Sequence, residues 1–393
     1  MQLVAGLSLA KLLFLSSAVL SALAVSLPNV LNLENIDSLR FYEDWETSRK
    51  PLVQAPVPNN PPGPKLPTPR PLVVWHGLGI HLYYDIDTEE YPIDVPFVGD
   101  TYTSPGMLEF MQLIKEIHND IFIHSVYLDV DPTADQRAGW VSSRSRCSSP
   151  VSLTGSEFGY VNDQIEFAAN QLANITELKD GFDAIGFSQG GQFLRAYAQR
   201  YPHAPPYPRV HNIITFGSQH MGVSDLPGCK PTDVLCRAAR TAARAGVYSV
   251  WAQNNLVQAQ YFRDHKRYPT YLEVNTFLAD LNNESPDAKN QTYVENFKAL
   301  DAFVLVIFEK DKTVVPKESS WFGSWSITDP DSDSEPEMLT MKQQPIYMED
   351  WIGLKSLDEA GKVFFESCPG EHMQLPTECW EWIVRKWVGQ KHM

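Results

Sequence analysis

The chain has 393 residues, 43% of them hydrophobic, which is enough to bury a large core in one α/β domain or in two smaller ones. Its formal net charge is -16 at pH 7. Because no basic stripe is present to displace the counterions of a phosphate backbone, we exclude nucleic acid as a partner.

The N-terminus has the features of a secretory signal peptide. An apolar run covers residues 12–25, and the small-residue site Ala22-Leu23-Ala24 ends just before Val25. We expect a signal peptide over residues 1–24 that is removed. A retained membrane anchor is the alternative, and it is disfavoured because the run is short for a spanning helix. The chain is therefore expected in the secretory pathway, with lysosome, vacuole or medium as destinations.

Residues 25–70 have little periodic pattern and become rich in proline towards their end. Proline favours extended backbone and cannot donate regular hydrogen bonds, so this segment is expected to be an N-terminal arm outside the core. The folded domain is expected to cover residues 71–393.

Within that domain, apolar runs rich in β-branched residues alternate with helical patterns. The expected strands are 72–75, 121–126, 182–187, 212–216, 303–308 and 363–366, and the expected helices are 107–118, 160–172 and 192–200. This alternation predicts an α/β fold with a mostly parallel sheet flanked by helices. A helical insertion at about 222–300, with helices over 234–245 and 248–263, is expected to lie over the active site. The acidic run 329–337 is expected to be a solvated loop, and we expect no metal and no cofactor.

The segment Gly186-Phe-Ser188-Gln-Gly190 follows an apolar strand and precedes a helical pattern. A Gly-x-Ser-x-Gly sequence in this context is typical of a nucleophile elbow, in which serine occupies a strained turn between strand and helix. Glycine is needed beside the serine because neighbouring backbone passes too close for a Cβ. Ser188 is therefore the candidate nucleophile.

A serine nucleophile needs a histidine base and an acid that orients the histidine, and in this fold they follow the serine in the order acid, histidine. His372 lies in a loop directly after an expected strand and is the candidate base. Asp311 lies in the turn after the strand 303–308 and is the candidate acid, with Glu309 as the alternative.

An oxyanion hole requires two preorganised N–H donors. The backbone N–H of Gln189, directly after the nucleophile, is the first candidate. The second is the N–H of Leu78, in the loop after the first strand of the domain. His76 in the same loop is expected to brace the loop and to take no direct part in the chemistry. Leu256, Tyr261 and Phe277 of the insertion are candidates for an acyl groove, although ordinary helix packing explains each of them singly.

Passage through an oxidising lumen would permit disulfides and N-glycans. Cys229 and Cys236 are close enough in sequence for a local disulfide, Cys368 and Cys379 could form a second, and Cys147 is left over. Three sequons are expected to be surface acceptors for glycans, at Asn174, Asn283 and Asn290.

Beyond the elbow, the chain resembles the lysosomal palmitoyl-protein thioesterases in colinear order over most of residues 71–388. The resemblance is carried by Pro71-Leu-Val-Val-Trp-His-Gly-Leu-Gly79, Gly186-Phe-Ser-Gln-Gly-Gly-Gln-Phe-Leu-Arg-Ala196, Gly217-Ser-Gln-His-Met-Gly-Val223 and Glu371-His-Met-Gln-Leu375. It departs at Ile80-His-Leu-Tyr and at Tyr201, where relatives tend to carry cysteines, so it supports only the Cys229–Cys236 bridge.

The resemblance implies an α/β-hydrolase fold and hydrolysis of long-chain acyl, especially palmitoyl, thioesters on protein or peptide cysteines. It implies the roles of Ser188, Asp311 and His372 as triad, with Leu78 and Gln189 as oxyanion donors. Two other interpretations stay open: a carboxylester lipase that prefers oxygen esters, and a non-catalytic lipid-binding relative, which the ordered triad disfavours.

Overall fold

The computed structural model describes residues 68–77, 101–139, 160–226, 234–286, 289–328 and 334–390, without the side chains of 234–239. Every described residue belongs to the unit Thr68–Met393. The expected signal peptide 1–24 and residues 25–67 of the expected arm lie outside the described residues. None of the described helices is long and apolar enough to cross a membrane.

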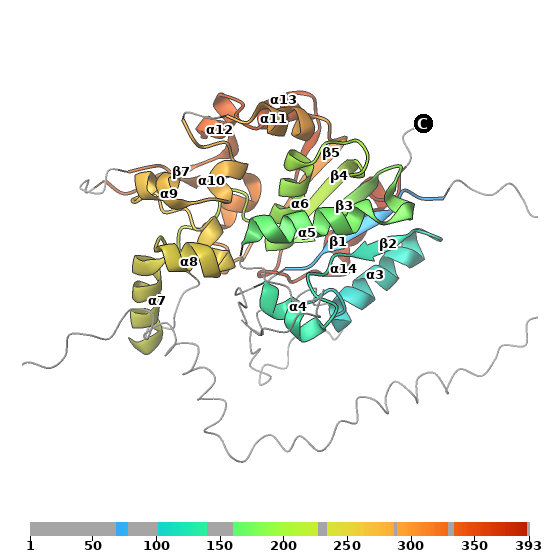
Figure 1. Ribbon diagram of the computed structural model, residues 1–393, viewed down its shortest axis with the longest axis horizontal. Coiled ribbons are helices and arrows are strands. Elements are labelled where there is room, and N and C mark those ends of the chain that lie inside the picture. The colour runs from blue at the N-terminus through green and yellow to red at the C-terminus, as the bar shows by residue number, and fades with distance from the viewer. Residues whose placement is uncertain are drawn as a thin grey trace, which may run out of the picture. The chain divides into compact units, whose positions relative to one another are not determined.

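A six-stranded parallel sheet forms the centre of the domain (Figure 1). Its strands lie in the order β2-β1-β3-β4-β5-β8. Their bounds are β1 Leu72–Trp75, β2 Ile123–Ser125, β3 Phe182–Phe187, β4 Val210–Phe216, β5 Ala302–Phe308 and β8 Val363–Cys368. All six expected strands are present, with bounds that agree to within about three residues. Because every pair is parallel, the carboxyl ends of the strands meet at one edge, where α/β proteins place their sites.

Helices cover both faces of the sheet (Figure 1). One face is packed by α5 (Val161–Ala173) and α6 (Gln189–Arg200), and the other by α3 (Pro105–Ile117) and α14 (Thr377–Trp387). The four inner strands are buried on both faces: in β1, for example, Val73 and Trp75 face the first layer, while Leu72 and Val74 face the second. This explains why the strands are near-continuous apolar runs.

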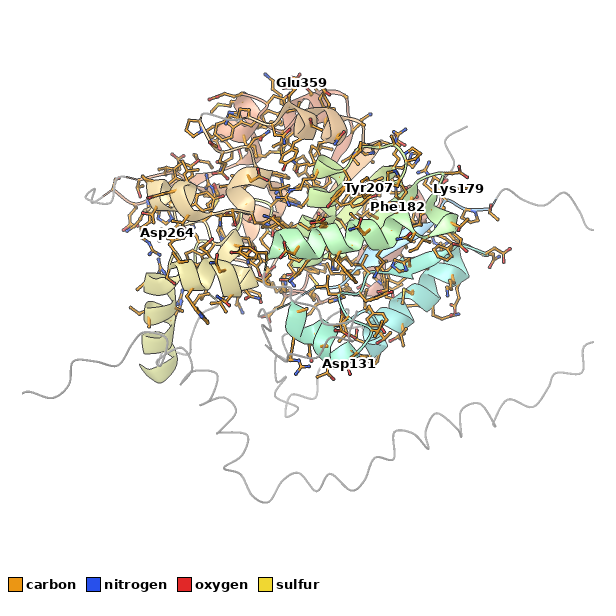
Figure 2. The ribbon with its side chains drawn as sticks, in the orientation of Figure 1. Asp131, Lys179, Phe182, Tyr207, Asp264 and Glu359 are labelled. Carbon is orange, nitrogen blue, oxygen red and sulfur yellow. A yellow bond between two sulfur atoms is a disulfide. The ribbon has the colours of Figure 1, made fainter. Side chains whose placement is uncertain are left out.

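Aromatic side chains tie α6 to the amino-terminal end of the sheet. Phe182 is the first residue of β3 (Figure 2). Its ring packs against Tyr197 of α6 with ring centroids 5.9 Å apart. Tyr201, at the end of α6, contacts both Tyr197 and Tyr207. This end of the sheet lies opposite to the ends at which the candidate site residues follow their strands.

The described parts of the segment between β4 and β5 are mostly helical. The described elements are α7 (Val234–Gly246), α8 (Val250–Asn255), η2 (Val257–Tyr261), α9 (Tyr268–Val274), α10 (Leu278–Leu281) and α11 (Gln291–Lys298). Shorter elements elsewhere are α4 (Pro132–Ala138), η1 (Thr176–Leu178), η3 (Lys317–Trp321), β6 (Ser324–Trp325), β7 (Met338–Leu339), η4 (Met341–Gln343), α12 (Pro345–Met348) and α13 (Leu354–Glu359).

The expected continuous helix over 248–263 is wrong. It is divided at Leu256, whose φ of -115° and ψ of 117° are extended. The side-chain amide of Gln253 donates to the carbonyls of Val247 and Ala259, so a side chain replaces part of the backbone bonding that a continuous helix would supply. The apolar periodicity of the segment does not reveal that the Gln253 side chain bonds to these backbone carbonyls.

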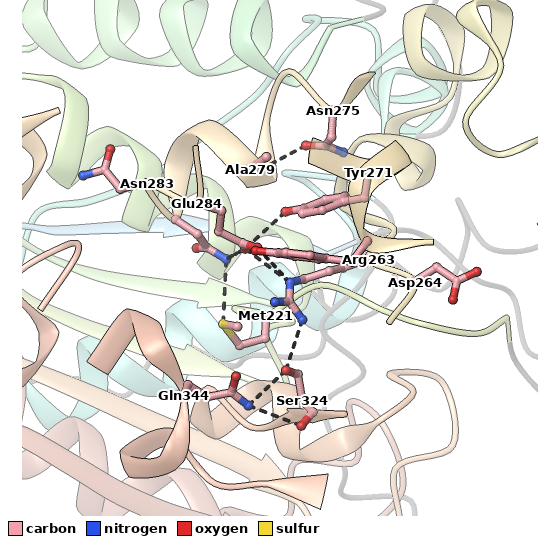
Figure 3. Close-up of polar contacts among 12 residues, drawn as sticks. Met221, Arg263, Asp264, Tyr271, Asn275, Ala279, Asn283, Glu284, Ser324 and Gln344 are labelled. Carbon is pink, nitrogen blue, oxygen red and sulfur yellow. Dashed lines mark hydrogen bonds and ion pairs between the residues drawn. The ribbon is translucent and has the colours of Figure 1, made fainter. Parts of the chain in front are cut away.

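A buried ion pair lies within the insertion, and its arginine also reaches the segment after β5 (Figure 3). Arg263 Nε donates to Glu284 Oε2 over 3.1 Å, and neither side chain is more than 5% exposed. Glu284 also accepts hydrogen bonds from Tyr268, Tyr271 and Asn282. Burial alone would lower the pKa of Arg263, but Glu284 and the tyrosines raise it above its usual value. The guanidinium therefore stays charged in the core and also binds Ser324.

Asp183, near the start of β3, binds residues from both ends of the described domain. Arg70 Nη1 donates to Asp183 Oδ1 over 2.8 Å, and the N–H of Gly389 donates to Asp183 Oδ2 over 2.9 Å. Arg70 is 8% exposed, so the last residue assigned to the arm is buried in the folded domain. That boundary of the expected arm is therefore corrected, because the proline content of the segment says nothing about the partner of Arg70.

Asp183 makes the stability of the domain depend on pH. Burial raises the pKa of Asp183 to about 7, although Arg70 and the nearby N–H groups oppose the shift. Between the pKa values of the unfolded and folded states, the folded state holds a proton on Asp183 that the unfolded state has released. The stabilisation that Asp183 contributes is therefore complete below about pH 4 and is lost as pH rises to about 7. The slope contributed is at most about 1.4 kcal/mol per pH unit. Asp183→Asn is expected to flatten this slope in denaturant titrations between pH 4 and 8; an unchanged slope would contradict the account.

Candidate active site

Ser188 lies at the turn between β3 and α6. Its φ of 51° and ψ of -122° are unusual for a residue with a side chain, which is the strained geometry expected of a nucleophile elbow. The Ser188 N–H donates to the Phe216 carbonyl of β4 over 2.8 Å, which holds the turn against the sheet. The residue is 7% exposed.

Glycines allow the elbow to close. A Cβ on Gly186 would lie 2.2 Å from Gly191 Cα, and a Cβ on Gly190 would lie 2.4 Å from the carbonyl oxygens of Trp75 and His76. These are backbone atoms that cannot move aside. The first turn of α6 is consequently pressed against the end of β1, and its free N–H groups and positive dipole end lie beside Ser188.

A continuous hydrogen-bond chain connects Asp311, His372 and Ser188. His372 Nδ1 lies 2.6 Å from Asp311 Oδ2, and His372 Nε2 lies 3.1 Å from Ser188 Oγ. The side chain of Asp311 is fully buried and that of His372 is 10% exposed. Ser188 and His372 thus meet at the carboxyl ends of β3 and β8, although 184 positions separate them in the sequence. The three expected residues come together in the arrangement in which a base and its orienting acid serve a nucleophile.

Asp311 is held by its own turn. Its Oδ1 accepts the backbone N–H groups of Thr313, over 2.8 Å, and Val314, over 3.0 Å, which leaves Oδ2 for His372. The alternative acid, Glu309, is exposed and its carboxylate accepts from the Ser367 hydroxyl instead. The turn therefore orients Asp311 and directs Glu309 elsewhere.

A disulfide lies beside the His372 loop. Cys368, the last residue of β8, is bonded to Cys379 of α14, with Cα atoms 5.4 Å apart. This is the second of the pairings considered from the sequence. It joins the start of the loop to the helix that follows it, so the loop carrying His372 is closed at both ends. Cys229, Cys147 and the Cys236 side chain lie outside the described part of the structure, and the Cys229–Cys236 bridge stays a prediction.

Gln189 begins α6, so its N–H belongs to the first turn, where helices have no internal acceptor. Leu78, the other oxyanion candidate, lies outside the described residues. The described part of its loop is close to the nucleophile, since a Cβ on Gly77 would lie 3.1 Å from Ser188 Cβ. His76 Nδ1 lies 2.9 Å from the Gly77 carbonyl and its Nε2 lies 3.1 Å from Asp135 Oδ2. This agrees with a bracing role for His76.

Two side chains near the site, Asp135 and Tyr261, make contacts that were not predicted from the sequence. Asp135 of α4 is fully buried, contacts His76 and accepts the backbone N–H of Leu128 over 2.6 Å. The Asp131-Pro132 pair before it is a helix-start signal, but it does not identify a partner for Asp135. Tyr261 was considered only for an acyl groove, and its hydroxyl donates to Gln189 Oε1. Phe277 is fully buried against Phe193, as ordinary packing predicts.

The three sequons differ in exposure. Asn174, at the end of α5, and Asn290, which caps α11, are exposed. Asn283 is 2% exposed, and its amide nitrogen donates to the carbonyls of Trp351 and Asn290 over 2.7 and 3.1 Å. The expected surface position of Asn283 is therefore wrong, because its side chain closes a local loop in the core.

The parallel sheet, its strand order and the elbow at the end of β3 define an α/β hydrolase. The sequence profile of the palmitoyl protein thioesterase family matches residues 71–372. Palmitoyl-protein thioesterase 1 of Caenorhabditis elegans is 34% identical over 307 residues, which cover 78% of this chain and 87% of that protein. The chain belongs to the palmitoyl-protein thioesterase family and is a thioesterase.

The chain is also similar to other proteins. Lysosomal thioesterase PPT2-B of Xenopus laevis is 34% identical over 217 residues, which cover 53% of this chain and 69% of that protein. Among solved structures, a carboxylesterase structure of the thaumarchaeon Nitrososphaera gargenis is similar with a TM-score of 0.34 and 10% identity. That likeness covers 80% of this chain and 89% of that one.

Proposed function

We propose that this protein removes long-chain acyl groups, palmitoyl in particular, from cysteine thioesters of proteins or peptides through an acyl-serine intermediate. The observation that carries the proposal is the hydrogen-bond chain from Asp311 through His372 to Ser188. Membership of the palmitoyl-protein thioesterase family gives the reaction its substrate class.

In the first half of the reaction, His372 Nε2 takes the proton of the Ser188 hydroxyl as Oγ attacks the thioester carbonyl. The Asp311 carboxylate accepts a hydrogen bond from Nδ1–H of the imidazolium, stabilises its charge and keeps Nε2 directed at the serine. The N–H groups of Gln189 and Leu78 stabilise the oxyanion of the tetrahedral intermediate. The C–S bond then breaks, the sulfur takes the proton from His372 Nε2 and leaves as a thiol, and the acyl group stays on Ser188 with His372 neutral again.

In the second half, His372 takes a proton from water, and the resulting hydroxide attacks the acyl-serine carbonyl. The tetrahedral intermediate collapses, the Ser188 oxygen regains the proton from His372, and the fatty acid is released. A cysteine thiol is more acidic than a serine hydroxyl and so leaves with less help from a general acid. Chain-length selectivity would follow from burial of the acyl chain, at about 0.8 kcal/mol for each methylene.

The leaving group is the part of this proposal that an assay can decide. Matched peptides carrying S-palmitoyl-cysteine or O-palmitoyl-serine should be supplied to the purified protein, and kcat/KM compared. We expect faster hydrolysis of the thioester. A higher kcat/KM for the oxygen ester would favour the carboxylester lipase interpretation instead.

We also propose that residues 1–24 direct the chain into the secretory pathway, with the lysosome or vacuole as the main destination and secretion as the alternative. The name of the Xenopus laevis relative, a lysosomal thioesterase, supports this location. An N-terminal arm that ends before Arg70 and a Cys229–Cys236 disulfide are further parts of this proposal.

Asn174 and Asn290 are expected to carry N-glycans in protein made through the secretory pathway, because both side chains are exposed. The variants Asn174→Gln and Asn290→Gln should each remove one glycosidase-sensitive increment of mass. Asn283→Gln serves as the contrast and should remove none. A glycan found on Asn283 in folded protein would contradict the buried position of its amide.

A further inference from the structure

Tyr261 connects the insertion to the residue that follows the nucleophile. It ends η2 and is 4% exposed, and its hydroxyl donates to Gln189 Oε1 over 3.4 Å. Gln189 is itself only 3% exposed. The bond therefore lies in the interior, where losing a donor leaves an acceptor without water to replace it.

The same hydroxyl takes part in a closed set of contacts. It interacts with the side-chain amides of Gln219, in the loop after β4, and of Gln258 in η2. The Gln219 carbonyl in turn accepts from the Gln192 amide of α6 over 2.7 Å. The contacts thus run from α6 to the β4 loop, on to the insertion and back to α6. Burial raises the pKa of Tyr261, so the hydroxyl keeps its proton and stays a donor.

From this arrangement we infer that Tyr261 is a positioning residue for the oxyanion hole. By holding the side chain of Gln189, its hydroxyl fixes the orientation of the Gln189 peptide, whose N–H is aimed at the developing oxyanion. Tyr261 acts through Gln189 and does not touch the reacting atoms. The inference rests on the proposed function, since it gives the Gln189 N–H the role stated there. Its physical basis is that a small displacement of a hydrogen-bond donor in an active site lowers the reaction rate strongly.

Tyr261→Phe tests the inference, because it removes the hydroxyl and keeps the ring. We expect kcat for palmitoyl-cysteine peptide to fall by about tenfold to a hundredfold, less than the loss of a whole oxyanion donor, with KM within about twofold. The rate of Ser188 labelling by a fluorophosphonate, which also forms a charged oxygen in the hole, should fall by a similar factor.

Tyr248→Phe is the matched control. Tyr248 lies in the same insertion and is 8% exposed, but its hydroxyl donates to the Phe262 carbonyl and accepts the Asp264 N–H. It should leave kcat and the labelling rate within about twofold of the wild type. An equal loss in both variants would mean that tyrosine hydroxyls only stabilise the insertion, and would overturn the inference.

A second variant keeps the test decisive if Tyr261→Phe is poorly folded. Gln189→Met removes the acceptor and leaves the backbone N–H, so it should reduce the labelling rate as Tyr261→Phe does, and the double variant should be no worse than either single one. Full activity of Gln189→Met or of Tyr261→Phe would overturn the inference. If the wild type is labelled but does not cleave palmitoyl-cysteine, the proposed function fails, and the labelling rates still decide the role of Tyr261.

Discussion

Ser188→Ala is expected to lower kcat on palmitoyl-cysteine peptide by on the order of a million-fold, as removal of a triad serine does in serine proteases. The loss is large because Ser188 Oγ, 3.1 Å from His372 Nε2, is the atom that forms the acyl bond. Steady-state kinetics and fluorophosphonate labelling measure it. The free energy of unfolding should change by less than about 0.5 kcal/mol, because the substitution removes one oxygen atom.

Ser218→Ala is the matched control for this experiment. Ser218 is fully buried beside Gly191, and within the described residues its hydroxyl has no hydrogen-bond partner. This variant should keep nearly full activity. The double variant Ser188→Ala with His372→Ala should be no less active than Ser188→Ala, because the residues work as a unit. Substantial activity in Ser188→Ala would remove the serine from the mechanism.

Glu284→Gln is expected to destabilise the domain by about 3–5 kcal/mol, because it leaves the Arg263 charge buried without its counter-charge. Arg263 is 6% exposed and Glu284 is 3% exposed, so water cannot take the place of the lost carboxylate. Tm should fall by roughly 6–15 °C. Calorimetry or denaturant titration gives the free energy of unfolding directly.

The control for charge removal is Glu273→Gln. Glu273 is an exposed residue of α9, and its substitution should change stability by less than about 0.5 kcal/mol. Arg263→Met combined with Glu284→Gln should recover part of the loss, because no unpaired charge then remains. A Glu284→Gln protein as stable as the wild type would show that the ion pair contributes nothing to the fold.

The central sheet could be predicted from sequence because its inner strands are buried on both faces. Runs such as Leu72–Trp75 and Phe182–Phe187 are almost wholly apolar. The candidate site could be predicted for a related reason. Each of its residues follows a strand end, and the parallel sheet brings those ends to one edge.

Contacts between distant segments could not be predicted in the same way. The pairing of His76 with Asp135, the burial of Asn283 and the bond from Tyr261 to Gln189 each depend on how the insertion and loops pack. A polar side chain at these positions has the same local pattern whether it is solvated or buried. The break at Leu256 was missed because apolar periodicity does not record side chains such as Gln253 that bond to backbone carbonyls.

The central claim is that the acyl group of palmitoyl-cysteine passes through Ser188. Rapid quenching during turnover, followed by mass spectrometry of the peptide that contains Ser188, measures this directly. The account predicts a palmitoyl ester on Ser188 that forms and decays at rates consistent with kcat, and that is absent from Ser188→Ala. Turnover of the thioester with Ser188 unmodified throughout, or with the acyl group on another residue, would contradict it.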